Sequence, residues 1–166
     1  MLIATVIVIV GLVAVAQLVP VSVMMNSNNR NDGTALVFGQ REMETLREQP
    51  LTSLAFADSV GVTCPLGDSC NLGDPAQPNV LVGSPVVLNT AGIAIIDFSA
   101  APVAGYSFTY TDPNDPFSAP YDVRWAIGTA VNTNNVVTSR RVIVGVFRRG
   151  MKTPTLPITL DTMVEK

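Results

Sequence analysis

The sequence predicts an α+β protein, in which one long N-terminal α-helix is followed by a small antiparallel β-sheet domain. No charged side chain occurs before Arg30, and a helical spacing of apolar residues continues to about residue 49. From residue 86 onward, short stretches with period-two alternation replace the helical pattern. A chain of 166 residues with one such helix leaves room for one modest globular domain.

The first 25 residues carry no charge. Met1 to Val19 alone can span a bilayer core of about 30 Å, which takes about 20 helical residues. A removable signal peptide would begin with basic residues and have a shorter apolar core. A buried core helix is the other alternative, but such a helix is seldom uncharged on every face. We therefore expect residues 1–25 to enter a membrane, with the rest of the chain outside the cytoplasm.

The helical pattern resumes in residues 34–49, where one face is apolar and the remainder is charged. The apolar face carries Leu36, Met43 and Leu46, and the charged positions are Arg41, Glu42, Glu44, Arg47 and Glu48. Pro50 ends this helix. Pro20 removes a backbone donor, and the Asn, Asp and Gly residues within 26–33 are weak helix formers. We expect one helix from Met1 to about Gln49 that bends or melts in its middle.

Residues 51–85 are rich in Pro, Gly, Asp and Ser and are expected to form an irregular connector, with a short strand at Phe56 to Val62. This connector holds the only two cysteines, Cys64 and Cys70, in the stretch CPLGDSC. Pro65 and Gly67 favour a turn that brings the two sulfurs together, so a local disulfide is predicted. The alternative is a pair of free thiols, and a zinc site would lack further ligands.

The remaining residues, 86–166, are expected to form the antiparallel sheet. Strands are predicted at 86–89, 93–99, 106–110, 121–127, 140–147 and 158–162, the last at an edge. The strand 121–127 alternates between an apolar and a polar face and should be half-buried, whereas 140–147 is apolar on both faces and more central. The turn NTNN at 132–135 should join these two strands as a hairpin. The predicted organisation is therefore a helix over 1–50, membrane-embedded at 1–25 and stalk-like at 26–50, a connector over 51–85 and a sheet over 86–166.

Composition argues against several classes of function. The chain has no histidine, so it lacks the usual general base, zinc ligand and Ser-His or Cys-His pairs. Ten basic residues stand against thirteen acidic ones without forming a stripe, so nucleic-acid binding is not indicated. No catalytic, cofactor-binding or metal-binding set converges, and we expect a protein that is not an enzyme. Two lesser alternatives are a calcium loop at Asp112, Asn114, Asp115 and Asp122, and an adhesive aromatic patch in place of core packing at Tyr106, Phe108, Tyr110 and Trp125.

The stretches MLIATVIVIVGLVAVAQL at the start and QREMETLREQPL at residues 40–51, with the strands YDVRW and RRVIVGV, resemble type IV pilins. The likeness is greatest to minor pilins of the PilV kind and to pseudopilins, strongly over the first 50 residues and loosely thereafter. In prepilins, a leader ending in glycine, a phenylalanine and a glutamate precede a run such as MLIA. The resemblance thus implies that Met1 is an internal methionine and that prepilin peptidase acts upstream of it.

The resemblance implies a function in assembly. The apolar helix would leave the inner membrane of a bacterium and pack against other pilin subunits in a filament, with the small domain on the outside. Small residues that let helices approach closely are expected at Gly11, Ala14 and Ala16, and a tolerated bend at Pro20. The alternative is that small residues and Pro are simply common in membrane helices. Within the charged run, Glu42, Glu44 and Glu48 would meet basic residues of the next subunit, or the run would form a solvated helix face.

Other functions remain open beside a minor pilin or pseudopilin. One is the major subunit of a filament, and another is a membrane-anchored extracytoplasmic binding domain that forms no filament.

Overall fold

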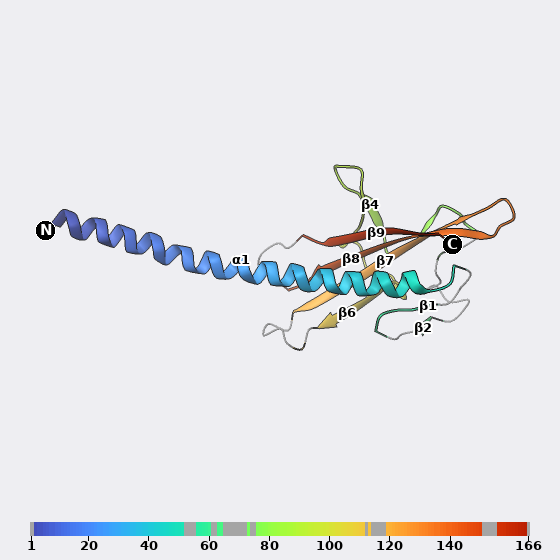
Figure 1. The fold of residues 1–166 in the computed structure, drawn as a ribbon, viewed down its shortest axis with the longest axis horizontal. Coiled ribbons are helices and arrows are strands. Elements are labelled where there is room, and N and C mark those ends of the chain that lie inside the picture. Colours follow the sequence, from blue (N-terminus) through green and yellow to red (C-terminus); the bar gives the residue numbers. More distant parts are fainter. Residues whose placement is uncertain are drawn as a thin grey trace. The chain divides into compact units, whose positions relative to one another are not determined.

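The computed structural model describes residues 2–51, 56–60, 63–64, 73, 76–111, 113, 119–150 and 156–165. The chain divides into two compact units, Met1–Thr34 and Ala35–Lys166, which we describe separately. Helix α1 (Leu2–Glu48) contributes to both units. The second unit contains the β-strands and the last four turns of α1 (Figure 1). The fold is α+β, as predicted.

Helix α1 is unbroken, so the prediction that its middle melts is wrong. Pro20 lies inside the helix, and residues 26–33 are helical throughout. Each weak helix former costs at most about 1 kcal/mol, and Pro about 3 kcal/mol, in a helix interior. Because helix propagation adds one hydrogen bond for each residue fixed, a helix that is formed on both sides continues through such a stretch. The Thr34 hydroxyl also donates to the Arg30 carbonyl at 3.0 Å, within the segment that was expected to break.

The main sheet has five antiparallel strands: β3 (Leu81–Gly83), β6 (Ser107–Thr111), β7 (Pro120–Val131), β8 (Val137–Arg148) and β9 (Ile158–Glu165). The order is β3-β7-β8-β9, and β6 also pairs with β7. The predicted hairpin is confirmed, with Trp125 opposite Val144 and a turn in which Asn132 Oδ1 accepts hydrogen bonds from the Asn134 and Val136 amides. The predicted edge strand is confirmed as β9, which pairs with β8.

Two short hairpins accompany this sheet. One pairs β1 (Phe56–Ala57) with β2 (Thr63–Cys64), and the other pairs β4 (Val86–Leu88) with β5 (Ala94–Ile96). Strand β3 lies in the range that was expected to be an irregular connector, yet it places Val82 opposite Ile127 of β7. The sheet therefore begins before residue 86. The three residues of β3 pair with β7 and add one short strand to the sheet.

One face of the sheet packs against the end of α1. Ala35, Met43 and Leu46 of the helix share a buried cluster with alternate residues of the two central strands: Tyr121, Val123, Trp125, Ile127, Val142, Val144 and Val146. The Phe38 ring lies 5.2 Å from the ring of Tyr121. This is the alternation that the sequence of β7 predicted for its apolar face. Tyr106 and Trp125 are also buried, and Trp125 contacts Phe108, which favours core packing over an adhesive patch for the aromatic residues.

The opposite face, which we call the outer face, is buried where β4 and β5 cover it. Ala126 and Ile143 pack there against Ala94 and Ile96, and Asp122 and Arg124 are buried as well. The prediction of a half-buried β7 is therefore wrong. The polar spacing of Asp122 and Arg124 suggested a solvated face, but the β4–β5 hairpin and the 97–100 turn that follows it cover this face.

Gly145 on β8 makes this cover possible. A Cβ atom added there would lie 2.7 Å from Cβ of Ile96 and 3.0 Å from Cε2 of Phe98. Gly145→Ala should therefore push the β4–β5 hairpin away from the sheet and lower the free energy of unfolding by about 1–3 kcal/mol. Urea unfolding of the full chain in detergent measures this, and hydrogen exchange of residues 94–98 should accelerate. Gly33→Ala is the matched control, because nothing lies within 4 Å of its added Cβ; a control that loses as much stability would contradict the explanation.

Candidate functional site

The first unit presents an apolar surface on all sides of a helix. In residues 4–26 every described side chain is exposed, including Val, Ile, Leu and Met residues along the whole stretch. This helix is long and apolar enough to cross a membrane, by length and composition. A surface of this kind is stable only in lipid or against other apolar helices. It is the largest unpartnered surface among the described residues of this unit.

The predicted helix-packing residues lie within this surface. Gly11, Ala14, Ala16 and Pro20 are all helical and exposed. A Cβ atom added at Gly11 would meet no atom within 4 Å, so the chain itself does not use the space that this glycine leaves. That space is available to another helix. The packing of these residues between subunits stays a prediction.

The five charged residues of the helix end have different surroundings. Glu44, Arg47 and Glu48 are exposed. Arg41 is exposed too, but its Nη2 donates to the Ser59 carbonyl at 3.0 Å. Glu42 is fully buried, and its Oε2 accepts the Ser59 backbone N–H at 2.9 Å. Arg41 and Glu42 thus bind the backbone carbonyl and the backbone N–H of Ser59, respectively.

Gln49, just after α1, also binds the backbone of the segment around Ala57. Its Nε2 donates to the Ala57 carbonyl at 2.8 Å, and its Oε1 accepts the Ala57 N–H at 3.3 Å. The burial of Glu42 fits neither of the two predictions for it, a contact with the next subunit or a place on a solvated helix face. Its spacing could have revealed this, since residues 35, 39, 42 and 46 fall on one helical face and all are buried. Glu44, Arg47 and Glu48 remain available to a partner.

Glu42 lies in the part of α1 that packs on the sheet, outside the uncharged stretch that can enter a membrane. Burial raises the pKa of its carboxyl above 4.5, and the hydrogen bonds from Ser59 oppose this only in part. The folded protein therefore binds this proton more tightly than the unfolded chain does. Its contribution to stability is complete below pH 4.5 and is lost as the pH rises through the folded-state pKa.

Glu42→Gln should remove this pH dependence. The amide keeps an oxygen for the Ser59 N–H and carries no charge to desolvate, so the variant should gain stability relative to the wild type as the pH rises above 4.5. Urea unfolding of both chains between pH 4 and pH 8 measures the difference. Glu44→Gln, at an exposed site, should stay within about 0.5 kcal/mol of the wild type at every pH. A constant offset between Glu42→Gln and the wild type would contradict this assignment.

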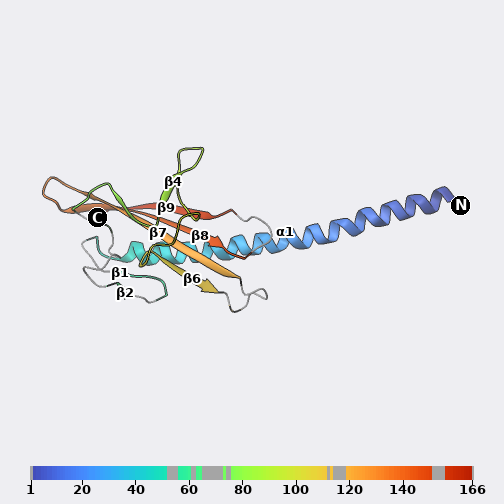
Figure 2. The same cartoon turned by 180° about the vertical axis from the view of Figure 1, so that it is seen from behind.

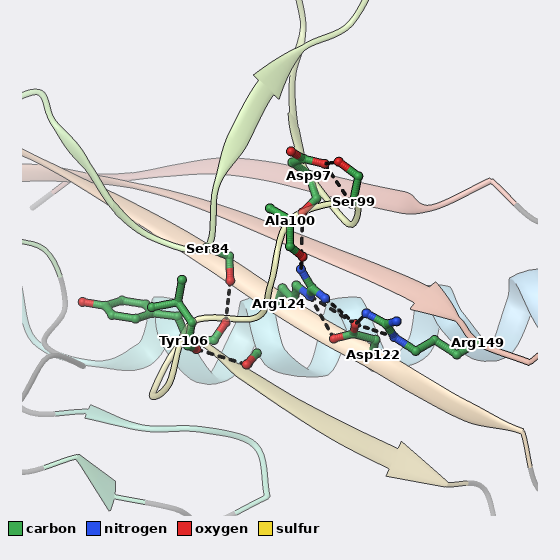
Figure 3. A network of polar contacts seen from close by, with 10 residues as sticks. Ser84, Asp97, Ser99, Ala100, Tyr106, Asp122, Arg124 and Arg149 are labelled. Atoms are coloured by element: carbon green, nitrogen blue, oxygen red, sulfur yellow. Dashed lines mark hydrogen bonds and ion pairs between the residues drawn. The ribbon is translucent and has the colours of Figure 1, made fainter.

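A polar cluster fixes the layer over the outer face (Figure 3). The guanidinium of Arg124, which is fully buried, bonds both carboxylate oxygens of Asp122, with the shortest contact at 2.8 Å from Nη2 to Oδ2. Its Nη1 donates to the carbonyls of Ala100 at 2.8 Å and Asp97 at 3.3 Å. The guanidinium also lies 5.0 Å from the centre of the Phe98 ring. One side chain of β7 thus holds the whole 97–100 turn.

Asp122 and Asp97 complete this cluster. The Asp122 carboxylate also accepts hydrogen bonds from Arg149 at 2.8 and 2.6 Å, so two cations share one buried anion. Ser99 donates its hydroxyl to Asp97 Oδ1 at 2.6 Å and its N–H at 2.8 Å, which lowers the pKa of that exposed carboxyl. The charged groups of this cluster bond one another, the Ser99 hydroxyl, or backbone carbonyl and N–H groups. The cluster is therefore structural.

Several sequence-based predictions concern residues outside the described part of the chain. The backbone of Cys64 belongs to β2, whereas its side chain and all of Cys70 lie outside the description, so the disulfide stays a prediction. Asp112, Asn114 and Asp115 of the possible calcium loop also lie outside it. Asp122, the fourth of those oxygen ligands, is engaged by Arg124 and Arg149. Among the described residues, no cluster of three acidic, cysteine or histidine side chains could hold a metal ion.

Comparisons with known proteins assign no family. The chain matches no protein-family model, no curated protein and no solved structure. The architecture alone is pilin-like: a long apolar N-terminal helix, of which the final turns pack on an antiparallel sheet.

Proposed function

We propose that this protein is a structural subunit of a type IV pilus or of a related secretion filament, in the manner of a minor pilin or pseudopilin. The observation that carries the proposal is the uncharged helix, exposed on every side over residues 4–26, which continues as the same α-helix into a folded domain. In a membrane this surface contacts lipid, and in a filament core it contacts other helices. The proposed partners are therefore the inner membrane and further pilin subunits.

The proposal assigns no catalysis to the chain. Two of the polar groups that the domain buries have a role within the fold: Arg124 bonds Asp122, and Glu42 Oε2 accepts the Ser59 N–H. We propose that the domain forms the outer surface of the filament and that prepilin peptidase processes the cellular protein. Mass spectrometry of the mature N-terminus tests the processing step directly, because an N-terminal methylated residue is the expected product of prepilin processing.

The second candidate is a membrane-anchored binding domain that forms no filament. The exposed apolar helix supports this function equally, since a single membrane span has the same requirements. The two candidates differ in one respect: a filament requires close contact between helices, whereas an anchor requires only lipid. A variant that leaves the helix apolar but makes it bulkier can therefore separate them.

Gly11→Leu is that variant. The substitution keeps the helix apolar, so the chain should stay in the membrane fraction, while the added side chain keeps neighbouring helices apart and reduces filament assembly. Leu12→Asp should abolish both membrane insertion and assembly, because a mid-helix carboxylate costs about 2.5–3.5 kcal/mol. Leu12→Met is the apolar control and should behave as the wild type.

The readouts are extraction of membranes with alkaline carbonate and the amount of the protein in filaments sheared from cells. A wild-type chain that stays in the membrane and never enters sheared filaments would contradict the filament proposal and favour the anchored domain.

A further inference from the structure

The β4–β5 hairpin ends in a rigid tip that exposes large apolar side chains. Leu88 is 71% exposed and Ile93 is 56% exposed, and Val87 adds a third apolar side chain. From Val82 to Ile96 the chain carries no charged residue. In both views the loop end of the hairpin stands away from the main sheet (Figures 1 and 2). Such a tip has no role in the core of its own domain.

Hydrogen bonds fix the conformation of this tip. Asn89 Oδ1 accepts the N–H groups of Ala91 and Ile93, both at 2.9 Å. The Asn89 N–H donates to the Ile93 carbonyl at 2.9 Å, and the Gly92 N–H donates to the Asn89 carbonyl at the same distance. Gly92 has a φ of 74°, which favours glycine. The tip therefore presents Leu88 and Ile93 without a further cost in chain ordering on binding.

A groove of about 300 Å³ opens on the outer face of the same sheet. Its floor is made of small residues of β7 and β8, namely Gly128, Ala130 and Ser139, between the side chains of Leu81 and Met163. For comparison, an apolar cavity of about 150 Å³ holds a benzene molecule. The groove therefore has room for branched aliphatic side chains.

The groove continues the surface that the hairpin already covers. Ala126 lies opposite Ile143, and this pair packs under Ala94 and Ile96 of the hairpin. The next two pairs along the same face are Gly128 with Arg141 and Ala130 with Ser139, which line the groove. The face thus receives aliphatic side chains of a β4–β5 hairpin in one half and is open in the other.

The charged side chain that lines the groove is already paired within the chain, so the groove suits an uncharged ligand. Arg141 lines the groove, and its Nη2 is paired with Asp161 at 2.6 Å, so its charge is compensated. The tip of the hairpin brings no charge that would need a partner. Docking the tip in the groove would therefore bury apolar surface without leaving an ion unpaired.

We propose that the hairpin tip of one copy of this chain docks in the groove of the next copy, head to tail. Three exposed side chains cover far less than the roughly 800 Å² per partner of a stable complex. The contact can therefore operate only where another interaction already concentrates the copies. In this respect the inference rests on the proposed filament, in which the apolar helices supply that interaction. Because the tip and the groove are different surfaces, the contact repeats along an open chain of copies.

Site-specific photo-crosslinking tests this contact in the full chain in cells. A photoreactive amino acid replaces Leu88, and the crosslinked peptides are identified by mass spectrometry. We expect products of two or more copies that join residue 88 to the peptides of β7, β8 or β9 around Ser139 and Met163. Ser139→Arg should lower their yield by about tenfold, since it fills the groove with a charged side chain. Thr138→Arg is the matched control, because Thr138 is exposed, adjoins Ser139 and does not line the groove.

The outcomes separate this inference from the proposed function. A photoreactive residue at Leu12, in the apolar helix, reports contacts between helices in the same cells. Helix crosslinks without crosslinks from residue 88 to the groove would overturn the inference and leave the filament intact. The inference is also wrong if residue 88 joins lipid or a different protein, if Ser139→Arg changes nothing, or if the products stop at the dimer. Absence of both kinds of crosslink would contradict the filament as well.

Discussion

Arg124→Ala should lower the free energy of unfolding by about 3–5 kcal/mol, the cost of breaking a buried ion pair from one side. The substitution removes the hydrogen bonds from Arg124 to Asp122 and leaves the carbonyls of Asp97 and Ala100 without their donor. Asp122 keeps Arg149, whose side chain is 48% exposed and is therefore a weaker partner. The 97–100 turn should detach, and with it the cover of the outer face.

Urea unfolding of the full chain in detergent measures the stability, and hydrogen exchange of residues 94–100 locates the change. Arg124→Lys is the matched control for charge. It keeps the cation but lacks the planar fork that reaches a carboxylate and two carbonyls together, so an intermediate loss is expected. A loss below about 0.5 kcal/mol for Arg124→Ala, typical of surface substitutions, would show that the cluster does not hold the turn.

The double variant Arg124→Met with Asp122→Leu probes the same cluster from the other direction. Replacing both buried charges with apolar residues of similar volume is often neutral or stabilising in proteins. Arg149 can return to solvent in this variant because it is half-exposed. We expect the double variant to be more stable than Arg124→Met alone, which would identify the weakly paired Asp122 carboxylate, and not lost packing at residue 124, as the main cost of losing Arg124.

These buried polar groups show where the sequence stops being informative. The alternation of Tyr121, Val123, Trp125 and Ile127 correctly predicted a strand and the face it turns to the core. The same alternation wrongly predicted that Asp122 and Arg124 face solvent. A period of two distinguishes the two faces of a strand but does not say whether both faces are covered. The cover comes from residues 86–98, which are close in space but distant in sequence. No local pattern in β7 contains that information.

The helix shows a second limit. The uncharged start predicted its type and its approximate ends, and the spacing of Met43 and Leu46 predicted an apolar face, to which Leu36 does not belong because it is exposed. Local propensity predicted a break within residues 26–33 that the structure does not have, since helix propagation outweighs a few weak helix formers. The groove and the hairpin tip could not be predicted either. To predict the groove, the register of four paired strands must be known, and to predict the tip, the exposure of its individual side chains must be known.

Trp125→Ala should be the most destabilising single change on the helix-facing side of the sheet. The Trp125 side chain is buried at the centre of the cluster that joins β7 to α1, and its ring lies 5.9 Å from that of Phe108 and 6.4 Å from that of Tyr106. Removal of a buried Trp side chain typically costs about 3–5 kcal/mol, from lost apolar burial and from the cavity left behind. Because Ala35, Met43 and Leu46 of the helix belong to the same cluster, the last turns of α1 should loosen together with the sheet.

Trp125→Phe is the matched control, since it keeps an aromatic ring at the site and should lose only part of that stability. Hydrogen exchange distinguishes the two faces: Trp125→Ala should increase exchange in residues 35–48, whereas Arg124→Ala should increase it in residues 94–100. The two residues are neighbours in β7 but point to opposite faces, so their effects should separate in this way. If both variants increased exchange in the same segment, the two faces of the sheet would not be independent layers, and the assignment of separate roles to the helix and to the β4–β5 hairpin would fail.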